Sequence, residues 1–137
     1  MHHFPPKHHT RALRIIDDVL SSDPVNVPCL LGRGHVLRDA RKWDDAVAVF
    51  CKVVELLPDD LKDGLRAREE RAWCLLQRQE AAEAEKEFLS VVEVLDREEG
   101  RETEAARCWR RLGQCRWDLE GTLPVLTQTP RAQRPRR

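Results

Sequence analysis

Residues 27–60, VPCLLGRGHVLRDARKWDDAVAVFCKVVELLPDD, hold the spacing of side chains that decides the fold. Their small, apolar and helix-ending residues stand at fixed offsets, at Leu30, Gly34, Leu37, Trp43, Ala46, Phe50 and Pro58. The pattern predicts two antiparallel helices that approach closely at Gly34 and Ala46, because these side chains are small. The larger apolar residues would fill the seam between the helices, and Pro58 would end the second helix. Residues 27–60 therefore predict one complete two-helix unit.

The same spacing extends upstream of this unit. Ala12, Ile16 and Val19 each precede their counterparts in residues 27–60 by 34 positions. They predict the second helix of a half repeat over residues 11–26. Because no first helix of that repeat is found in the sequence, we expect this end of the stack to lack one partner helix.

The spacing also continues downstream, in a longer form. A divergent repeat over residues 61–98 places its small and aromatic residues 38 positions later, at Ala72, Ala84 and Phe88. We expect the four added residues to extend the helix that begins near residue 61. A last half repeat over residues 102–119 begins another first helix, marked by Trp109, Leu112 and Gly113.

The sequence therefore predicts an all-α fold of antiparallel helices near residues 11–22, 27–40, 44–57, 61–78, 81–96 and 102–119. Stacked helical repeats share a continuous core, so the two end helices should each leave apolar residues without a partner. We expect these residues to be Leu13, Ile16 and Leu20 at one end and Leu112 at the other.

The two ends of the chain do not follow the pattern. Residues 1–10 show no helical period and contain two prolines, so we expect a disordered leader. The histidines of this leader are not expected to bind a metal, since no carboxylate or thiol lies nearby. In residues 120–137, Pro124 and Pro130 oppose a helix, which favours a disordered, Arg-rich tail. Such a tail could touch RNA without sequence specificity.

Composition agrees with one helical domain. Of the 137 residues, 35% are charged, and tyrosine is absent. Ala, Leu, Arg and Glu are abundant, which favours helices over strands. The formal net charge of +0 gives no general attraction to nucleic acid or to a membrane surface. Because no signal peptide or membrane-spanning run is found, we expect a cytoplasmic protein, with a nuclear location as the alternative.

The residue types argue against an enzyme. Five scattered cysteines without a C-x-x-C pair predict small buried side chains rather than a disulfide framework, a metal site or a cofactor site. Cys29 and His35 do not share a helix face, so they do not form a nucleophilic pair. Glu69 and Glu70 are interleaved with arginines, which is typical of a solvated helix surface.

The repeat pattern resembles that of the tetratricopeptide repeat (TPR) family, in which Trp-x2-Leu-Gly-x2-Tyr is followed by Ala-x3-Phe and Pro in about 34 residues. The resemblance covers residues 11–119. It implies a short right-handed superhelix of stacked hairpins that serves as a scaffold for protein–protein interaction.

Three segments are more specifically similar to the scaffold-subunit family of fungal superkiller complexes. They are DPVNVPCLLGRGHVLRDARKWDDAVAVF (23–50), GLRAREERAWCL (64–75) and EAARCWRRLGQCRWD (104–118). This resemblance implies a cytoplasmic scaffold that holds a DExH-type RNA helicase and WD-repeat subunits. It implies support of exosome-dependent 3′-to-5′ mRNA decay, with no sequence-specific nucleic-acid contact and no membrane partner.

A chaperone-type TPR adaptor is the alternative. Such a module grips an acidic peptide terminus with Lys, Arg and Asn from successive first helices. In the first full repeat the fifth and ninth places, which should offer Lys and Asn, are Leu31 and His35. The predicted clamp is therefore incomplete.

In the TPR family, given places of each first helix line a partner-binding groove. With Val27, Leu65 and Ala106 as first places, the groove candidates are His35, Arg38, Arg66, Glu69, Trp73, Arg107, Arg110, Gln114 and Trp117. Tryptophan and arginine often carry much of an interface's binding energy. For Trp73 and Trp117, the sequence leaves open whether the side chain binds a partner or packs against a neighbouring helix.

Overall fold

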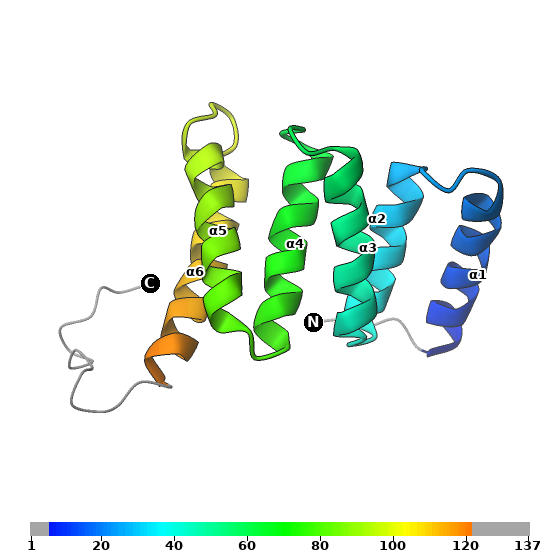
Figure 1. Cartoon of the computed structure of the whole chain (residues 1–137), viewed down its shortest axis with the longest axis horizontal. Coiled ribbons are helices and arrows are strands. Elements are labelled where there is room, and N and C mark those ends of the chain that lie inside the picture. Colours follow the sequence, from blue (N-terminus) through cyan, green and yellow to red (C-terminus); the bar gives the residue numbers. More distant parts are fainter. Residues whose placement is uncertain (1–5, 122–137) are drawn as a thin grey trace.

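A computed structural model describes residues 6–121, and every regular element in this range is a helix. The helices are α1 (Pro6–Ser22), α2 (Val27–Asp39), α3 (Trp43–Leu56), α4 (Asp63–Gln77), α5 (Ala81–Asp96) and α6 (Glu102–Gly121). They stand side by side in sequence order (Figure 1), and each packs against the next. The predicted all-α stack of antiparallel helical hairpins is confirmed.

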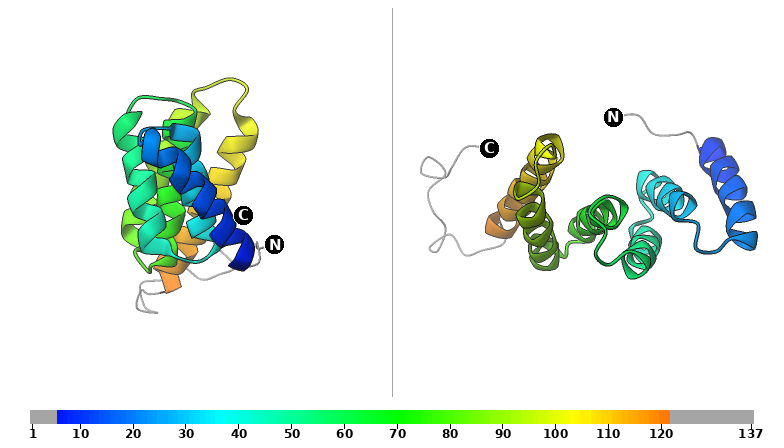
Figure 2. Two further views of the ribbon diagram at one scale, coloured as in Figure 1. Left: turned by 90° about the vertical axis from the view of Figure 1, so that its right-hand side faces the viewer. Right: turned by 90° about the horizontal axis from the view of Figure 1, so that it is seen from above.

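The helices form two rows, with α2, α4 and α6 in one and α3 and α5 in the other (Figure 2). The helix α4 contacts both α2 and α6, whereas α3 and α5 are not in contact. The stack therefore curves toward the row of first helices, and we call the surface of α2, α4 and α6 the concave face.

Local side chains explain where the helices begin. The Asn26 side chain accepts a hydrogen bond from the Cys29 amide at 3.0 Å, which caps the N-terminus of α2. Ahead of α4, the Asp60 carboxylate accepts from the amides of Lys62 at 3.1 Å and Gly64 at 3.0 Å. Gly64 has no room for a side chain, because a Cβ there would lie 2.2 Å from the Leu57 carbonyl oxygen.

The core consists of two clusters, one around Phe50 and one around Phe88, both fully buried. Most residues that define the repeat are buried as expected: Leu30, Leu37, Ala46, Phe50, Ala72, Ala84 and Phe88. Trp43 begins α3 and packs against the first cluster, and Pro58 follows the end of that helix. A Cβ on Gly34 would lie only 2.6 Å from the Phe50 ring, so glycine is what permits this close approach.

The start of the first helix and the end of the last helix differ from the predictions: α6 ends at Gly121, so residues 120 and 121 of the predicted disordered tail are helical. Helix α1 begins at Pro6, five residues before the predicted start at residue 11. Proline is favoured in the first turn of a helix, where its missing amide hydrogen is not needed, so Pro6 did not exclude a helix. The leader prediction for residues 1–5, and the tail prediction for 122–137, lie outside the described residues.

The four added residues of the divergent repeat are divided between a loop and a helix. The connection before α4 covers residues 57–62, whereas the one before α2 covers 23–26. Leu65, which stands 38 residues after Val27, is the third residue of α4 rather than the first. Two added residues therefore lengthen the loop and two lengthen the helix, and the prediction of a purely helical extension is wrong.

The apolar residues predicted to lack partners at the two ends do have them. Leu112 is fully buried, and Leu13 and Leu20 pack against the first core cluster. Ile16 reaches α2, since its Cδ1 lies 3.5 Å from a Cβ built on Gly32. The adjacent helix of the stack therefore covers Leu13, Ile16 and Leu20 in part, whereas Leu112 is completely buried.

Among residues 6–121, no helix combines the length and the apolar character that crossing a lipid bilayer requires.

Candidate functional site

Two neighbouring carboxylates lie buried in the middle of α4. The side chain of Glu70 is 0% exposed and that of Glu69 is 2% exposed. The prediction that this acidic pair lies on a solvated helix surface is therefore wrong. The sequence signal was present in the surrounding arginines, but their spacing along the chain does not reveal that three helices bring them together.

Glu70 is held by arginines from three helices. It accepts from Arg38 Nη1 of α2 at 2.6 Å and from Arg66 Nε of its own helix at 2.9 Å. Arg111 Nη1 of α6 lies 3.5 Å away. Burial opposes ionisation, but the positive charges of Arg111, Arg38 and Arg66 outweigh it and lower the pKa of Glu70 from 4.5 to about 2. Glu70 is therefore a carboxylate at neutral pH.

Glu69 joins α4 to α6. Arg107 grips it with two hydrogen bonds, from Nε at 2.8 Å and from Nη2 at 2.7 Å. Arg111 Nη1 also donates to Glu69, at 2.8 Å. Paired bonds between a guanidinium and a carboxylate fix orientation as well as distance. The two acids and their four arginines form one network, which we call the carboxylate–arginine network.

In this network the negative charges are buried and the positive charges lie at the surface of the concave face. The arginine side chains keep between 18% and 38% of their surface exposed, whereas the carboxylates beneath them are almost completely covered. A molecule that approaches the concave face therefore meets guanidinium groups, each held in place by a buried acid.

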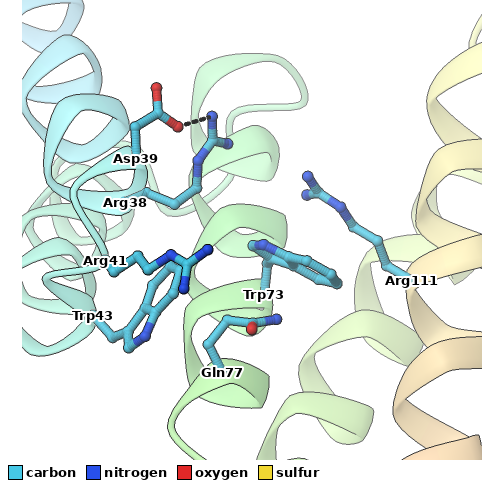
Figure 3. A pocket seen from close by; sticks show the side chains of 7 residues that line it. All are labelled: Arg38, Asp39, Arg41, Trp43, Trp73, Gln77 and Arg111. Carbon is cyan, nitrogen blue, oxygen red and sulfur yellow. Dashed lines mark hydrogen bonds and ion pairs between the residues drawn. The ribbon is translucent and has the colours of Figure 1, made fainter. Parts of the chain in front are cut away.

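A cleft of about 540 Å³ opens beside the network (Figure 3). Its walls come from α2, the turn after α2, the start of α3, α4 and α6, through Arg38, Asp39, Arg41, Trp43, Trp73, Gln77 and Arg111. Trp73 lies between the α2 and α6 sides of the cleft, and the Arg111 guanidinium sits 4.9 Å from the centre of its ring. This volume suits a few side chains of a bound segment.

Arg41 is the cleft arginine whose side chain is not paired with an acid among residues 6–121. It forms no ion pair within the part of the chain that the structure describes, whereas Arg38 and Arg111 both contact buried acids. Its backbone has φ 62°, and Gln79, 38 residues later, repeats this left-handed turn with φ 68°. The repeat register thus extends to the backbone of the turns between paired helices.

The structure brings some predicted groove residues together and separates others. Arg38 and Trp73 line the cleft, while Arg66, Glu69 and Arg107 belong to the carboxylate–arginine network beside it. The remaining candidates lie elsewhere on the first helices: His35, Arg110, Gln114 and Trp117. Whether these nine residues bind a partner stays a prediction.

His35 and Gln114 are each engaged within the chain. The His35 ring is tilted at 54° to the Phe50 ring with 5.8 Å between centroids, and burial lowers the pKa of this histidine. Gln114 donates to Asp118 at 2.8 Å. Trp73 packs against the second core cluster and also lines the cleft, so the packing interpretation is confirmed while partner binding by this side chain stays a prediction.

Sequence reasoning missed Asp39, Arg41, Gln77 and Arg111 as cleft residues and gave Trp43 a purely structural role. Arg41 and Trp43 lie in and just after the turn between paired helices, outside the places of the first helix that the family pattern assigns to a groove. The signal that could have found them is the run Arg41, Lys42, Trp43, two cations followed by an indole in a short turn.

Two of the buried cysteines are poor nucleophiles. Burial raises the pKa values of Cys74 and Cys108 to about 12, so both thiols stay protonated at neutral pH. Residues 6–121 also contain no group of three His, Cys, Asp or Glu side chains arranged to hold a metal ion.

Comparison with known proteins gives one partial likeness. The chain is 33% identical over 57 residues to Superkiller protein 3 of Saccharomyces cerevisiae. The match covers 42% of this chain and 4% of that protein, so the chain corresponds to only a small part of it. No family model matches the sequence. No solved structure matches it either.

Proposed function

We propose that this chain is a helical-repeat scaffold that binds other proteins and has no catalytic activity of its own. The observation that carries the proposal is the concave face, where the cleft exposes two indole rings beside three guanidinium groups. Tryptophan and arginine are enriched among the residues that dominate binding energy at protein interfaces. The proposed site needs no cofactor.

The partial likeness to Superkiller protein 3 supports a more specific role. The chain would form part of the TPR scaffold of a cytoplasmic superkiller complex and contribute to exosome-dependent 3′-to-5′ mRNA decay. Its partners would be the RNA helicase and WD-repeat subunits of that complex. The chain would hold these proteins and would not itself read RNA sequence.

Reconstitution tests this role. The purified full chain is mixed with the helicase subunit, the WD-repeat subunit or both, and the mixtures are separated by size-exclusion chromatography. We expect co-elution with at least one subunit. Arg41→Glu, which reverses a charge in the cleft, should weaken co-elution, whereas Arg97→Glu at the far end of α5 should not.

The outcomes separate the general proposal from the specific one. If neither subunit co-elutes with the unmodified chain, the assignment to a superkiller complex is wrong. If a subunit binds both charge-reversal variants equally well, the chain is a scaffold but its binding surface is not the concave cleft.

A further inference from the structure

We propose that the cleft lined by Arg41, Trp43 and Trp73 binds an acidic peptide segment of a partner, with an aromatic or bulky apolar side chain beside a carboxylate. This inference rests on the proposed scaffold function and specifies the ligand of its site. It differs from the clamp of a chaperone-type TPR module, since it uses a turn and the start of a second helix.

The two indoles supply the apolar part of the site. Trp43 opens α3 and Trp73 lies in the second half of α4, so two different helices present their rings to one cleft (Figure 3). Each ring also packs against one of the core clusters, which limits its motion. Rigid aromatic walls lose little conformational entropy when a side chain inserts between them.

The charges of the site favour an anion. The network and the cleft walls together contain five guanidinium groups, from Arg38, Arg41, Arg66, Arg107 and Arg111. They contain three carboxylates, from Asp39, Glu69 and Glu70, so two positive charges remain in excess. The two carboxylates of α4 are buried and do not line the cleft, whose own walls hold three of these guanidinium groups, from Arg38, Arg41 and Arg111, and one carboxylate, that of Asp39.

The cations are also positioned before a ligand arrives. Arg38 donates to Glu70 and to Asp39, and Arg111 donates to Glu69 at 2.8 Å while it covers Trp73. Such bonds reduce the ordering cost that a free arginine would pay on binding. Among the described residues Arg41 supplies the cleft cation that forms no ion pair, which makes it the main candidate to contact a carboxylate of the peptide.

The surroundings favour a peptide over a nucleic acid. Asp44 and Asp45 follow Trp43 directly, both are exposed, and they line a shallow depression that adjoins Arg41. A single nucleic-acid strand needs a positively charged path along several phosphates. Here such a strand would leave the cleft and meet the two aspartates, whereas a short acidic segment would not have to.

Direct binding to the purified full chain tests the proposal. The probe is the blocked peptide Ac-Gly-Asp-Phe-Asp-Gly-NH2, titrated at low salt and followed by tryptophan fluorescence and by calorimetry. Three comparison ligands are measured in the same way. The peptide with Asn for both Asp tests the carboxylates, the peptide with Gly for Phe tests the aromatic ring, and an oligouridylate tests for binding of nucleic acid. We expect the Asp-Phe-Asp peptide to bind most tightly and its affinity to fall as salt is added.

Matched variants locate the site. Arg41→Asn removes the charge with a residue that tolerates a left-handed backbone, so the fold should be kept. We expect it to weaken peptide binding about fivefold to tenfold, since a contact to an unpaired carboxylate is lost. Arg97→Asn removes one positive charge from the exposed end of α5 and should change the affinity less than about twofold. Circular dichroism of both variants checks that the helices are intact.

Several results would overturn the inference. Equal affinity for the Asp and Asn peptides, equal effects of Arg41→Asn and Arg97→Asn, or absence of peptide binding would each do so. Tighter binding of the oligouridylate would show that the cleft accepts nucleic acid instead. If the peptide fails while superkiller subunits still bind, this inference falls and the proposed function stands. If the peptide binds but no subunit does, this inference and the general scaffold function stand, and only the assignment to a superkiller complex falls.

Discussion

Arg38 of α2 donates to Glu70 of α4 at 2.6 Å, a bond that spans 32 residues of sequence and joins the first helices of successive hairpins. Arg111 of α6 approaches Glu70 from the other side, at 3.5 Å. The concave face is therefore held together by one buried carboxylate shared among three helices. Breaking this link should loosen the stack without disturbing the apolar seams within each hairpin.

The first prediction follows from the lowered pKa of Glu70. With a folded-state pKa of about 2 against an ordinary value of 4.5, ionised Glu70 stabilises the fold by about 3 kcal/mol. This stability is fully present above pH 4.5 and is lost as the pH falls to about 2. Denaturant unfolding measured from pH 7 to pH 2 should show the loss.

The variant Glu70→Gln tests whether protonation of Glu70 causes this loss of stability at low pH. At pH 7 it should be less stable than the unmodified chain by about 3 kcal/mol, because the arginines lose their buried counter-charge. The difference should shrink below pH 4.5 and nearly vanish near pH 2, where Glu70 itself becomes protonated. A constant difference across the pH range would contradict the ionisation argument.

The second prediction compares two glycines of the same helix. In Gly34→Ala the new Cβ would lie 2.6 Å from the buried Phe50 ring, so we expect a loss of about 1–3 kcal/mol from overpacking. In Gly32→Ala the nearest atom, Ile16 Cδ1, is 3.5 Å away, an ordinary contact. That variant should gain about 1 kcal/mol from helix propensity. Urea unfolding of the two variants should therefore give changes of opposite sign.

Much of this fold could be predicted because its repeat is built from side-chain size. The small Ala46 and the large Phe50 fit a closely packed helix pair. Residues of such sizes recur at fixed spacing, so the pattern can be recognised in the sequence. The burial of Glu69 and Glu70 could not be seen in the same way. It depends on Arg38, Arg107 and Arg111, which reach α4 from other helices only once the stack has formed.

The cleft was predictable only in part, for a related reason. Arg38 and Trp73 occupy places of the first helices that the family pattern assigns to a groove. Arg41 joins them because its left-handed φ of 62° shapes the turn toward α3. Residue types at regular spacing indicate which helices pack, but they do not indicate which turn residue faces the concave side.

The third prediction concerns the second left-handed turn. Gln79 has φ 68°, a conformation that costs a residue with a side chain about 1 kcal/mol and that glycine adopts freely. Gln79→Gly relieves this cost, but glycine also increases the conformational entropy of the unfolded chain, which opposes the gain. The net change in stability should therefore lie between zero and a gain of about 1 kcal/mol. Thermal unfolding measures the change. Gln77→Gly, inside the last turn of α4, is the control and should lose about 1 kcal/mol.

The last prediction separates two residues of one sequence signature, Trp109 and Leu112. Leu112 is completely buried in the core around Phe88, so Leu112→Ala should cost about 2–5 kcal/mol. Trp109 is 44% exposed, although Leu30 at the corresponding place of α2 is only 5% exposed. Helix α3 covers Leu30, whereas no helix follows α6 within residues 6–121 to cover Trp109 in the same way.

The indole of Trp109 instead donates to the carboxylate of Asp96, at 3.3 Å to its nearer oxygen. Trp109→Ala loses this exposed bond and a partly covered ring, so we expect a cost of about 1 kcal/mol. Chemical denaturation of both variants at one pH gives the comparison. A cost for Trp109→Ala as large as that for Leu112→Ala would mean that this ring is covered in solution. Trp109 would then be buried like Leu30, the residue at the corresponding place of α2.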